Sequence, residues 1–214
     1  MYSVRLAAPG CPLTKPALIV ASRESARYVQ SRADSFATWN TSLAESPSPY
    51  YRFKAGLAQE TRCDDEPGYG ATRTVAAKPT IDEALPAREG LYLLCIEGSS
   101  DGHSFDEPDA ALSLLSEVDN TPPQLPDASQ LVSVYPDGQL SVRLAVDSLE
   151  IAKFYYRLQR PAETDCTPDA SDLVATTWQE FSISPSEPRR ELCLTAEDAA
   201  GNRSRASRVS LELP

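Results

Sequence analysis

The only histidine of the chain, His103, lies in a loop that carries many of the side chains able to do chemistry. Asp101, Ser104, Phe105 and Asp106 surround it, so that serine, histidine and aspartate are neighbours in sequence. Adjacent side chains do not point at one another as a catalytic triad requires, and the sequence contains no phosphate-binding glycine loop, zinc-protease helix or serine elbow. The sequence therefore predicts a protein that is not an enzyme.

The same loop is the best candidate for ligand binding, because loops at the rim of a rigid scaffold carry most binding sites. His103 and Phe105, between the carboxylates of Asp101 and Asp106, suit a basic protein surface or a carbohydrate. Calcium is an alternative ligand, since it takes about six to eight oxygen atoms and acidic side chains crowd residues 101–109. Their spacing matches no defined calcium loop, so we expect a solvated acidic loop without metal or cofactor.

Five cysteines carry the second chemical signal. Cys63 and Cys95 fall at places in one stretch of chain that match Cys166 and Cys193 in another, while Cys11 lies outside both stretches. Two disulfides, Cys63–Cys95 and Cys166–Cys193, are the simplest interpretation, with buried free thiols as the alternative. Zinc would need additional ligands that neither stretch offers. Disulfides persist outside the reducing cytosol, so they predict an extracellular, cell-surface or periplasmic protein.

These two stretches repeat one pattern about 105 residues apart. Tyr50-Tyr51-Arg52-Phe53 and Leu94-Cys95-Ile96 recur as Tyr155-Tyr156-Arg157-Leu158 and Leu192-Cys193-Leu194. Self-similarity at this period indicates two copies of one small domain.

The repeat sets the expected domain boundaries. Residues 1–22 have no counterpart and are expected to form an N-terminal extension or an added hairpin, followed by a first domain over 23–119 and a second over 120–214. Asp119-Asn120-Thr121-Pro122-Pro123 joins the copies, and its two prolines restrict the backbone. The first residues lack the basic segment and apolar core of a secretory signal. Either this sequence begins after such a signal, or the argument for export from the disulfides is wrong.

Strand periodicity dominates both copies, as in the alternation of Leu140, Val142 and Leu144 with polar residues. The pattern predicts these strands: Ala26–Gln30, Phe36–Thr41, Tyr50–Ala55, Arg73–Ala77, Leu91–Gly98, Leu112–Val118, Leu131–Tyr135, Leu140–Val146, Lys153–Gln159, Thr176–Ile183, Glu191–Glu197 and Arg208–Leu213. Ile81–Leu85 is the one candidate for a helical turn. Many short strands separated by Pro, Gly, Asp and Ser indicate an all-β protein of two tandem antiparallel β-sandwiches, with one disulfide each.

The aromatic residues that recur in both copies are expected to lie in the cores. Trp39 and Trp178 accompany the tyrosine pairs, and one tyrosine of each pair must face inward on an alternating strand. A sugar-binding aromatic platform is the alternative interpretation.

The end of the second copy resembles the late strand and loop of bacterial Ig-like and fibronectin type III-like domains. In that family Asp-x-Ala-Gly-Asn, here Asp198-Ala199-Ala200-Gly201-Asn202, commonly closes a repeat, and Asp-x-Thr-Pro-Pro, here Asp119 to Pro123, opens the next. The first copy departs from the motif, with Gly98 to His103 in its place. The aspartate of the motif is expected to accept local backbone N–H bonds and form the turn. The resemblance implies tandem Ig-like or fibronectin type III-like domains of a bacterial surface or secreted protein.

Charge and hydropathy narrow the set of partners. Thirty-one acidic against 20 basic side chains give a net charge of -11, which repels a nucleic-acid backbone. No apolar run approaches the roughly 20 residues of a membrane helix, so no membrane insertion is expected. We expect a non-catalytic module that serves as a spacer, in adhesion, or in binding a protein or glycan, beside other domains of a larger parent protein. An accessory domain pair of an exported hydrolase is the alternative.

Overall fold

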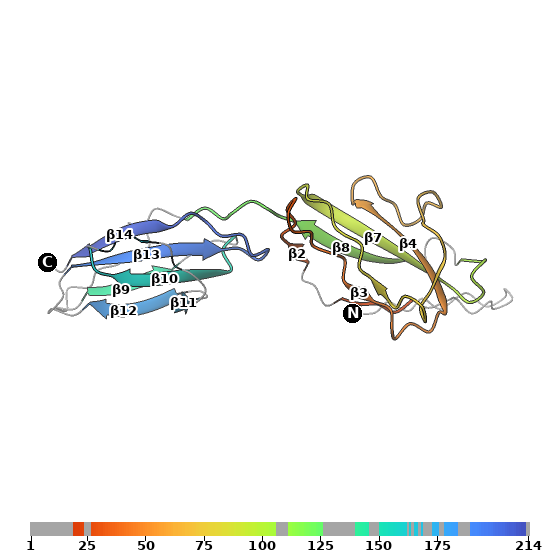
Figure 1. Ribbon diagram of the computed structural model, residues 1–214, viewed down its shortest axis with the longest axis horizontal. Helices are drawn as coiled ribbons and strands as arrows, with labels where there is room; N and C mark the ends of the chain where they lie inside the picture. The colour runs from red at the N-terminus through yellow and green to blue at the C-terminus, as the bar shows by residue number, and fades with distance from the viewer. Residues whose placement is uncertain are drawn as a thin grey trace. The chain divides into compact units, whose positions relative to one another are not determined.

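The computed structural model of this 214-residue chain is all-β (Figure 1). The residues it describes are 19–23, 27–105, 111–125, 140–145, 150–161, 163, 165–166, 168, 173–175, 178–183 and 189–212. They form fourteen strands, and every strand pair with a defined register is antiparallel. Nowhere in these ranges is there a helix long and apolar enough to cross a membrane.

The chain divides into two compact units. The first consists of Thr38–Leu85, Gly90–Glu117 and the chain before Tyr28, and the second contains Val118 and the residues after it. By their contacts, Tyr28–Ala37 and Pro86–Glu89 belong with the second unit. The sequence repeat predicts both segments within the first domain, residues 23–119.

Two sheets contain the strands of residues 19–118. A three-stranded sheet has the order β1-β3-β6, and a five-stranded sheet has the order β2-β8-β7-β4-β5. The strands are β1 Ser22–Arg23, β2 Tyr28–Val29, β3 Thr41–Ser42, β4 Tyr50–Leu57, β5 Arg73–Thr74, β6 Thr80–Ile81, β7 Gly90–Ser99 and β8 Leu112–Val118.

The core of the first unit is built by both of its sheets. Tyr51, Leu94 and Ile96 come from the central strands β4 and β7, while Trp39 and Ile81 come from the other sheet or its edge, and all five are at most 1% exposed. Trp39 is therefore a core residue, as predicted. Side chains alternate between the two faces of a strand, so Arg52, Lys54 and other even-numbered residues of β4 lie on the face opposite Tyr51.

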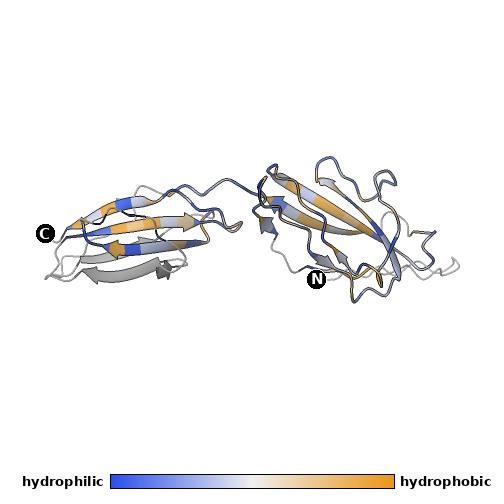
Figure 2. Cartoon of the chain, viewed as in Figure 1, coloured by the Kyte–Doolittle hydropathy of each residue, from blue (hydrophilic) through white to orange (hydrophobic). Residues whose placement is uncertain are grey.

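The second unit also has two sheets. One has the order β11-β10-β13-β14 and the other pairs β12 with β9. The strands are β9 Leu140–Ala145, β10 Lys153–Gln159, β11 Leu173–Ala175, β12 Trp178–Ile183, β13 Arg189–Glu197 and β14 Ser207–Glu212. Phe154, Tyr156, Leu192, Leu194 and Leu211 are buried, and Figure 2 shows the hydrophobic residues of β13 in orange. The side chain of Trp178 lies outside the described residues.

Most predicted strands are present, and the exceptions are short. β8 and β10 have the predicted bounds, whereas Phe36–Thr41 is a strand only from Thr41 onward. The expected helical turn at Ile81–Leu85 is wrong, because Ile81 ends β6 and Ala84 bridges to Thr38. The predicted strand Leu131–Tyr135 lies outside the described residues.

The two predicted disulfides are confirmed. Cys63 is bonded to Cys95 with Cα atoms 5.3 Å apart, and Cys166 is bonded to Cys193 with Cα atoms 5.2 Å apart. Cys95 on β7 and Cys193 on β13 are fully buried, so each bond ties a connection between strands to a central strand of its own unit. The predicted fold class, all-β with antiparallel sheets and one disulfide in each unit, is confirmed.

The repeated sequence motifs do not occupy the same register in the two units. Lys54 pairs with Cys95 across β4 and β7, and Arg52 pairs with Glu97. In the second unit Arg157 pairs with Cys193 itself. Relative to the disulfide cysteine, the Tyr-Tyr-Arg motif is therefore displaced by two residues between the units, which preserves the face on which each side chain lies.

Candidate functional site

Arg52 lies at the centre of a cluster of charged and aromatic side chains on the outer face of β4. Its Nη1 and Nη2 donate to the two carboxylate oxygens of Glu66, at 2.6 and 2.7 Å, and its Nε donates to Glu97 Oε2 at 2.7 Å. The side chain of Glu97 is only 1% exposed and that of Arg52 is 15% exposed. The bidentate hydrogen bonds to Glu66, followed by those to Glu97, raise the pKa of Arg52, so the guanidinium holds both carboxylates as a permanent cation.

Two aromatic rings pack against the same guanidinium. The Cζ atom of Arg52 lies 4.2 Å from the ring centroid of Phe105 and 4.8 Å from that of Tyr69. Contacts of this kind are worth about 0.5–2 kcal/mol, depending on how far the cation is desolvated. Arg52 thus joins the loop that contains Tyr69 to the loop that contains His103 and Phe105. We call the residues Arg52, Glu66, Tyr69, Glu97 and Phe105 the Arg52 cluster.

Lys54 also holds the loop that contains Tyr69. Its Nζ donates to the carbonyl oxygens of Asp65 and Pro67 and lies 4.4 Å from the Tyr69 ring centroid. The Tyr69 hydroxyl donates to the Cys63 carbonyl at 3.0 Å. Burial, and then the nearby Glu97 carboxylate, raise the pKa of Tyr69, so this hydroxyl keeps its proton at neutral pH.

The predicted binding loop is closed by its own aspartate. Asp101 Oδ1 accepts the backbone N–H groups of Ser104 at 2.7 Å and His103 at 2.8 Å, and the Ser99 hydroxyl donates to it at 3.0 Å. These bonds, led by that of Ser104, hold the pKa of Asp101 well below its usual range. Gly102 has a φ of 77°, and a Cβ atom there would lie 3.1 Å from the Tyr50 ring, so a larger residue would be both strained and crowded.

The structure shows the contacts of the described residues in the predicted binding loop, and ligand binding by His103, Phe105, Asp101 and Asp106 stays a prediction. The carboxylate of Asp101 forms the turn and Phe105 covers Arg52, while His103 is exposed. Asp106 lies outside the described residues, as do Glu107 and Asp109 of the same acidic loop. Within the described ranges, no three His, Cys, Asp or Glu side chains gather to hold a metal ion.

Sequence reasoning did not identify the residues that hold this loop in place. The sequence singles out Arg52 only as part of the Tyr-Tyr-Arg repeat, and no motif marks Glu66 and Glu97 as its partners. The alternation of Lys54 and Arg52 with Tyr51 and Phe53 was the available signal, because two cations on one face of a central strand require partners.

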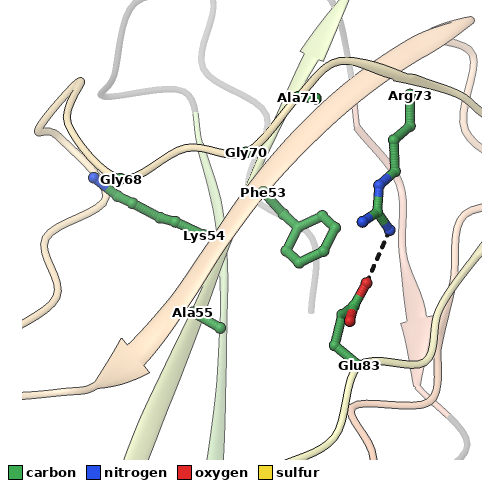
Figure 3. Close-up of a pocket in the computed structure, with 8 residues that line it drawn as sticks. All are labelled: Phe53, Lys54, Ala55, Gly68, Gly70, Ala71, Arg73 and Glu83. Atoms are coloured by element: carbon green, nitrogen blue, oxygen red, sulfur yellow. Dashed lines mark hydrogen bonds and ion pairs between the residues drawn. The ribbon is translucent and has the colours of Figure 1, made fainter.

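A hollow of about 340 Å³, the Phe53 groove, lies beside β4 in the first unit. Its lining residues are Phe53, Lys54, Ala55, Gly68, Gly70, Ala71, Arg73 and Glu83. Figure 3 shows the Phe53 ring directed toward the ion pair of Arg73 and Glu83, whose Nη1 and Oε1 atoms are 3.0 Å apart. The Arg73 guanidinium lies 4.7 Å from the Phe53 ring centroid.

The second unit has a simpler charged cluster on β10 and β13. Glu197 lies 2.6 Å from Lys153 Nζ and 2.8 Å from Arg203 Nε, and the Arg203 guanidinium lies 4.0 Å from the Tyr155 ring centroid. Burial alone would raise the pKa of Glu197, but the hydrogen bonds from Lys153 and Arg203 outweigh burial and lower it.

The Asp198–Asn202 loop of the second unit has the role predicted for it. Asp198 Oδ1 accepts the backbone N–H groups of Ala200 and Asn202, both at 2.9 Å, and Gly201 has a φ of 91°. The prediction that Asp198 forms the turn is confirmed. The loops that follow β7 and β13 are therefore both closed by an aspartate that accepts two backbone N–H groups.

No protein-family model matches the chain, and no curated protein sequence matches it. Among solved structures, the chain is similar to the FN1-FN3 domains of chicken CNTN1, with 13% identity over 94% of this chain and 70% of that chain, at a TM-score of 0.39. It is also similar to the fibronectin(III)-like modules of Clostridium thermocellum CbhA, with 16% identity over 91% of this chain and 94% of that chain, at a TM-score of 0.41. These likenesses carry no argument about activity or partners, and the all-β assignment rests on the strand pairing described above.

Proposed function

We propose that this chain is a non-catalytic tandem module of a bacterial cell-surface or secreted protein, which acts as a spacer and presents the end of its first unit to a protein or glycan. The observation that carries the proposal is the pair of disulfides, one in each unit, whose strand cysteines Cys95 and Cys193 are fully buried. Bonds of this kind persist in oxidising compartments and stabilise small β domains.

The Arg52 cluster supports the presenting role. A loop that is ordered before binding loses less conformational entropy when a ligand arrives. Asp101 closes the turn around His103, and Phe105 is fixed against Arg52, so the exposed His103 is held by a rigid support. The part of the loop from Ser99 to Phe105 therefore resembles a preformed contact surface.

An accessory role beside an exported hydrolase is the second candidate. The observation in its favour is the Phe53 groove, which combines an aromatic ring with a carboxylate and a guanidinium. These residue types suit the recognition of a carbohydrate substrate, as an accessory role requires.

The test of the exported location is the thiol state of the protein in its native source. Cells are treated with an alkylating reagent before lysis, and the disulfides are mapped by mass spectrometry. We expect Cys63 linked to Cys95 and Cys166 linked to Cys193. We also expect the remaining cysteine, Cys11, to be labelled by a reagent that cannot cross the membrane. Reduced and unlabelled Cys63 and Cys166 in intact cells would contradict export.

The presenting role is tested with the purified protein on arrays of matrix proteins and glycans. Saturable binding that His103→Ala weakens would support contact through this loop. Unchanged binding by the variant would place the contact elsewhere, and the absence of any saturable binding would leave the spacer role alone.

A further inference from the structure

We propose that the Phe53 groove binds a neutral polyhydroxylated ring, namely one pyranose unit of a glycan. This inference rests on the proposed function only in assuming that the protein meets glycans outside the cell. It concerns a site separate from the loop of His103.

The groove exists because three of the four positions from 68 to 71, on one wall, are small. Gly68, Gly70 and Ala71 leave open the space beside β4 that larger side chains would fill, and the resulting volume of about 340 Å³ lies at the lower end of the range for small-molecule sites, about 300–1,000 Å³. The Gly70 N–H donates to the Phe53 carbonyl at 3.0 Å, which fixes this wall against the strand.

The polar groups of the groove are already paired in a way that favours a neutral ligand. Arg73 and Glu83 neutralise each other, yet their side chains are 33% and 44% exposed. The ammonium of Lys54 is directed away from Phe53 and donates to Asp65 and Pro67 (Figure 3). A charged ligand would have to compete with these pairs, whereas a hydroxyl group can donate to the carboxylate and accept from the guanidinium at once.

The apolar floor suits the face of a sugar ring. Phe53 is half-buried and lines the groove, with the Arg73 guanidinium 4.7 Å from its ring centroid, and its neighbours Ala55 and Ala71 are small and exposed. An aromatic surface beside a few convergent polar groups is the usual composition of a small-ligand site. Strand alternation also directs the backbone N–H and C=O of Ala55 toward the same edge as the Phe53 carbonyl, where they can bond to ligand hydroxyls.

The edge of β4 is too short to accept an added peptide strand. The pairing of β5 with β4 covers Tyr50 and Tyr51, and the Leu57 carbonyl accepts the N–H groups of Glu60 and Thr61. Between these bonds the Phe53 carbonyl already accepts the Gly70 N–H. Recognition by strand addition needs a longer row of backbone groups. A compact ring therefore fits this site better than an extended peptide.

The test uses the purified full chain and a panel of neutral oligosaccharides built from glucose, galactose, mannose or N-acetylglucosamine. Binding is measured by calorimetry, and the contact residues are found by NMR titration. We expect at least one neutral glycan to bind with a Kd tighter than about 10 mM, and the amide signals of Phe53, Ala55 and Ala71 to shift.

Two variants test the site itself. Ala71→Leu fills the groove and is expected to weaken binding at least tenfold, while Glu83→Gln removes one charged acceptor and is expected to weaken it about fivefold. Ala76→Leu is the matched control, because Ala76 is also exposed, lies in the same unit and does not line the groove. Thermal unfolding of each variant shows that it is folded.

Each outcome decides the proposal. Glycan binding that Ala71→Leu abolishes and Ala76→Leu preserves would support it. No binding by any neutral glycan, equal binding by wild type and Ala71→Leu, or binding in this groove of charged glycans or peptides alone would overturn it. Because the assay uses purified protein, its failure would leave the thiol test of export unaffected, and reduced cysteines in cells would leave the measured glycan binding unaffected.

Discussion

Arg52 on β4 and Glu97 on β7 face each other across the central strand pair of the first unit, although 45 positions separate them in sequence. Arg52 Nε donates to Glu97 Oε2 at 2.7 Å, and the carboxylate is almost fully buried. A buried carboxylate is tolerated only when a cation and hydrogen bonds compensate for its lost hydration. The same Arg52 also contacts Glu66, Tyr69 and Phe105, so two loops depend on one strand residue.

Removal of the guanidinium is expected to destabilise the first unit strongly. Arg52→Ala leaves Glu97 buried without its partner, and we expect a loss of about 3–5 kcal/mol in the free energy of unfolding. Arg52→Lys keeps the charge but loses the bidentate geometry, and we expect a smaller loss of about 1–3 kcal/mol. Urea denaturation measures both changes.

Arg62 supplies the matched control for this experiment. It lies 2.7 Å from Asp64, but the two side chains are 72% and 47% exposed. Exposed ion pairs contribute at most about 1 kcal/mol, so Arg62→Ala is expected to change stability little. Equal losses in Arg52→Ala and Arg62→Ala would show that the Arg52 cluster adds nothing beyond a surface ion pair.

The two disulfides are expected to contribute equally to stability. Sequence separations of 32 and 27 residues give closed loops of similar length, for which the chain-entropy model predicts about 3–4 kcal/mol each. The double variants Cys63→Ala with Cys95→Ala, and Cys166→Ala with Cys193→Ala, remove each bond without leaving a thiol. Each unit has one tryptophan, Trp39 or Trp178, whose fluorescence can follow its unfolding. Losses that differ by more than about 2 kcal/mol would contradict the entropic account.

Asp101 is expected to protect two backbone amides through its side-chain oxygen. Asp101→Ala removes the acceptor for His103 and Ser104, so the exchange of both amide hydrogens should accelerate about tenfold or more. Asp101→Asn keeps one carbonyl oxygen and should change the exchange by less than about threefold. Because the pKa of Asp101 is depressed, the protection in wild type should persist at pH 4. Rapid exchange of both amides in wild-type protein would contradict the turn seen here.

Protonation of Glu197 is expected to make the second unit less stable in acid. Its folded-state pKa is lowered, so its contribution is fully present above the ordinary glutamate value of about 4.3 and is lost as the pH falls through the folded-state value. Glu197→Gln should cost about 1–2 kcal/mol at pH 7 and almost nothing near pH 2, because the wild-type side chain is then protonated. Urea denaturation at both pH values measures the difference.

Glu212 provides the comparison for the acid experiment. It pairs with Arg189 at 3.2 Å, but both side chains are more than half exposed, at 61% and 72%. Glu212→Gln should therefore have a small effect at either pH. If Glu197→Gln costs the same at pH 7 and pH 2, its effect does not come from the ionised carboxylate.

The sequence predicts the long elements of this fold better than the short ones. β8 and β10 follow directly from alternation, and the cysteine positions were enough to pair the disulfides. β3 could not be placed, because the segment before Thr41 is held by single bridges, such as that between Thr38 and Ala84, instead of a periodic pattern.

The site residues depend on contacts between loops that are distant in sequence. Phe105 has the composition of a ligand contact, and only the packed structure places its ring on Arg52. The Phe53 groove depends on Gly68, Gly70 and Ala71, which have no chemical signature of their own and matter because of the space they leave. Such features require the three-dimensional arrangement of the strands.

The displaced register of the two units limits how their segments can be exchanged. A recombinant that joins the copies at the Tyr-Tyr-Arg motif would keep every side chain on its proper face, since a shift of two residues preserves the pleat. However, the motif places Arg52 opposite Glu97 in the first unit and Arg157 opposite Cys193 in the second, so a recombinant strand would set its arginine opposite a residue that it does not meet in its own unit. Crossovers aligned on Cys95 and Cys193 would preserve the ladder. The resemblance between the copies is thus a poor template for shuffling, and the paired strands β4 and β7, like β10 and β13, have to be exchanged together.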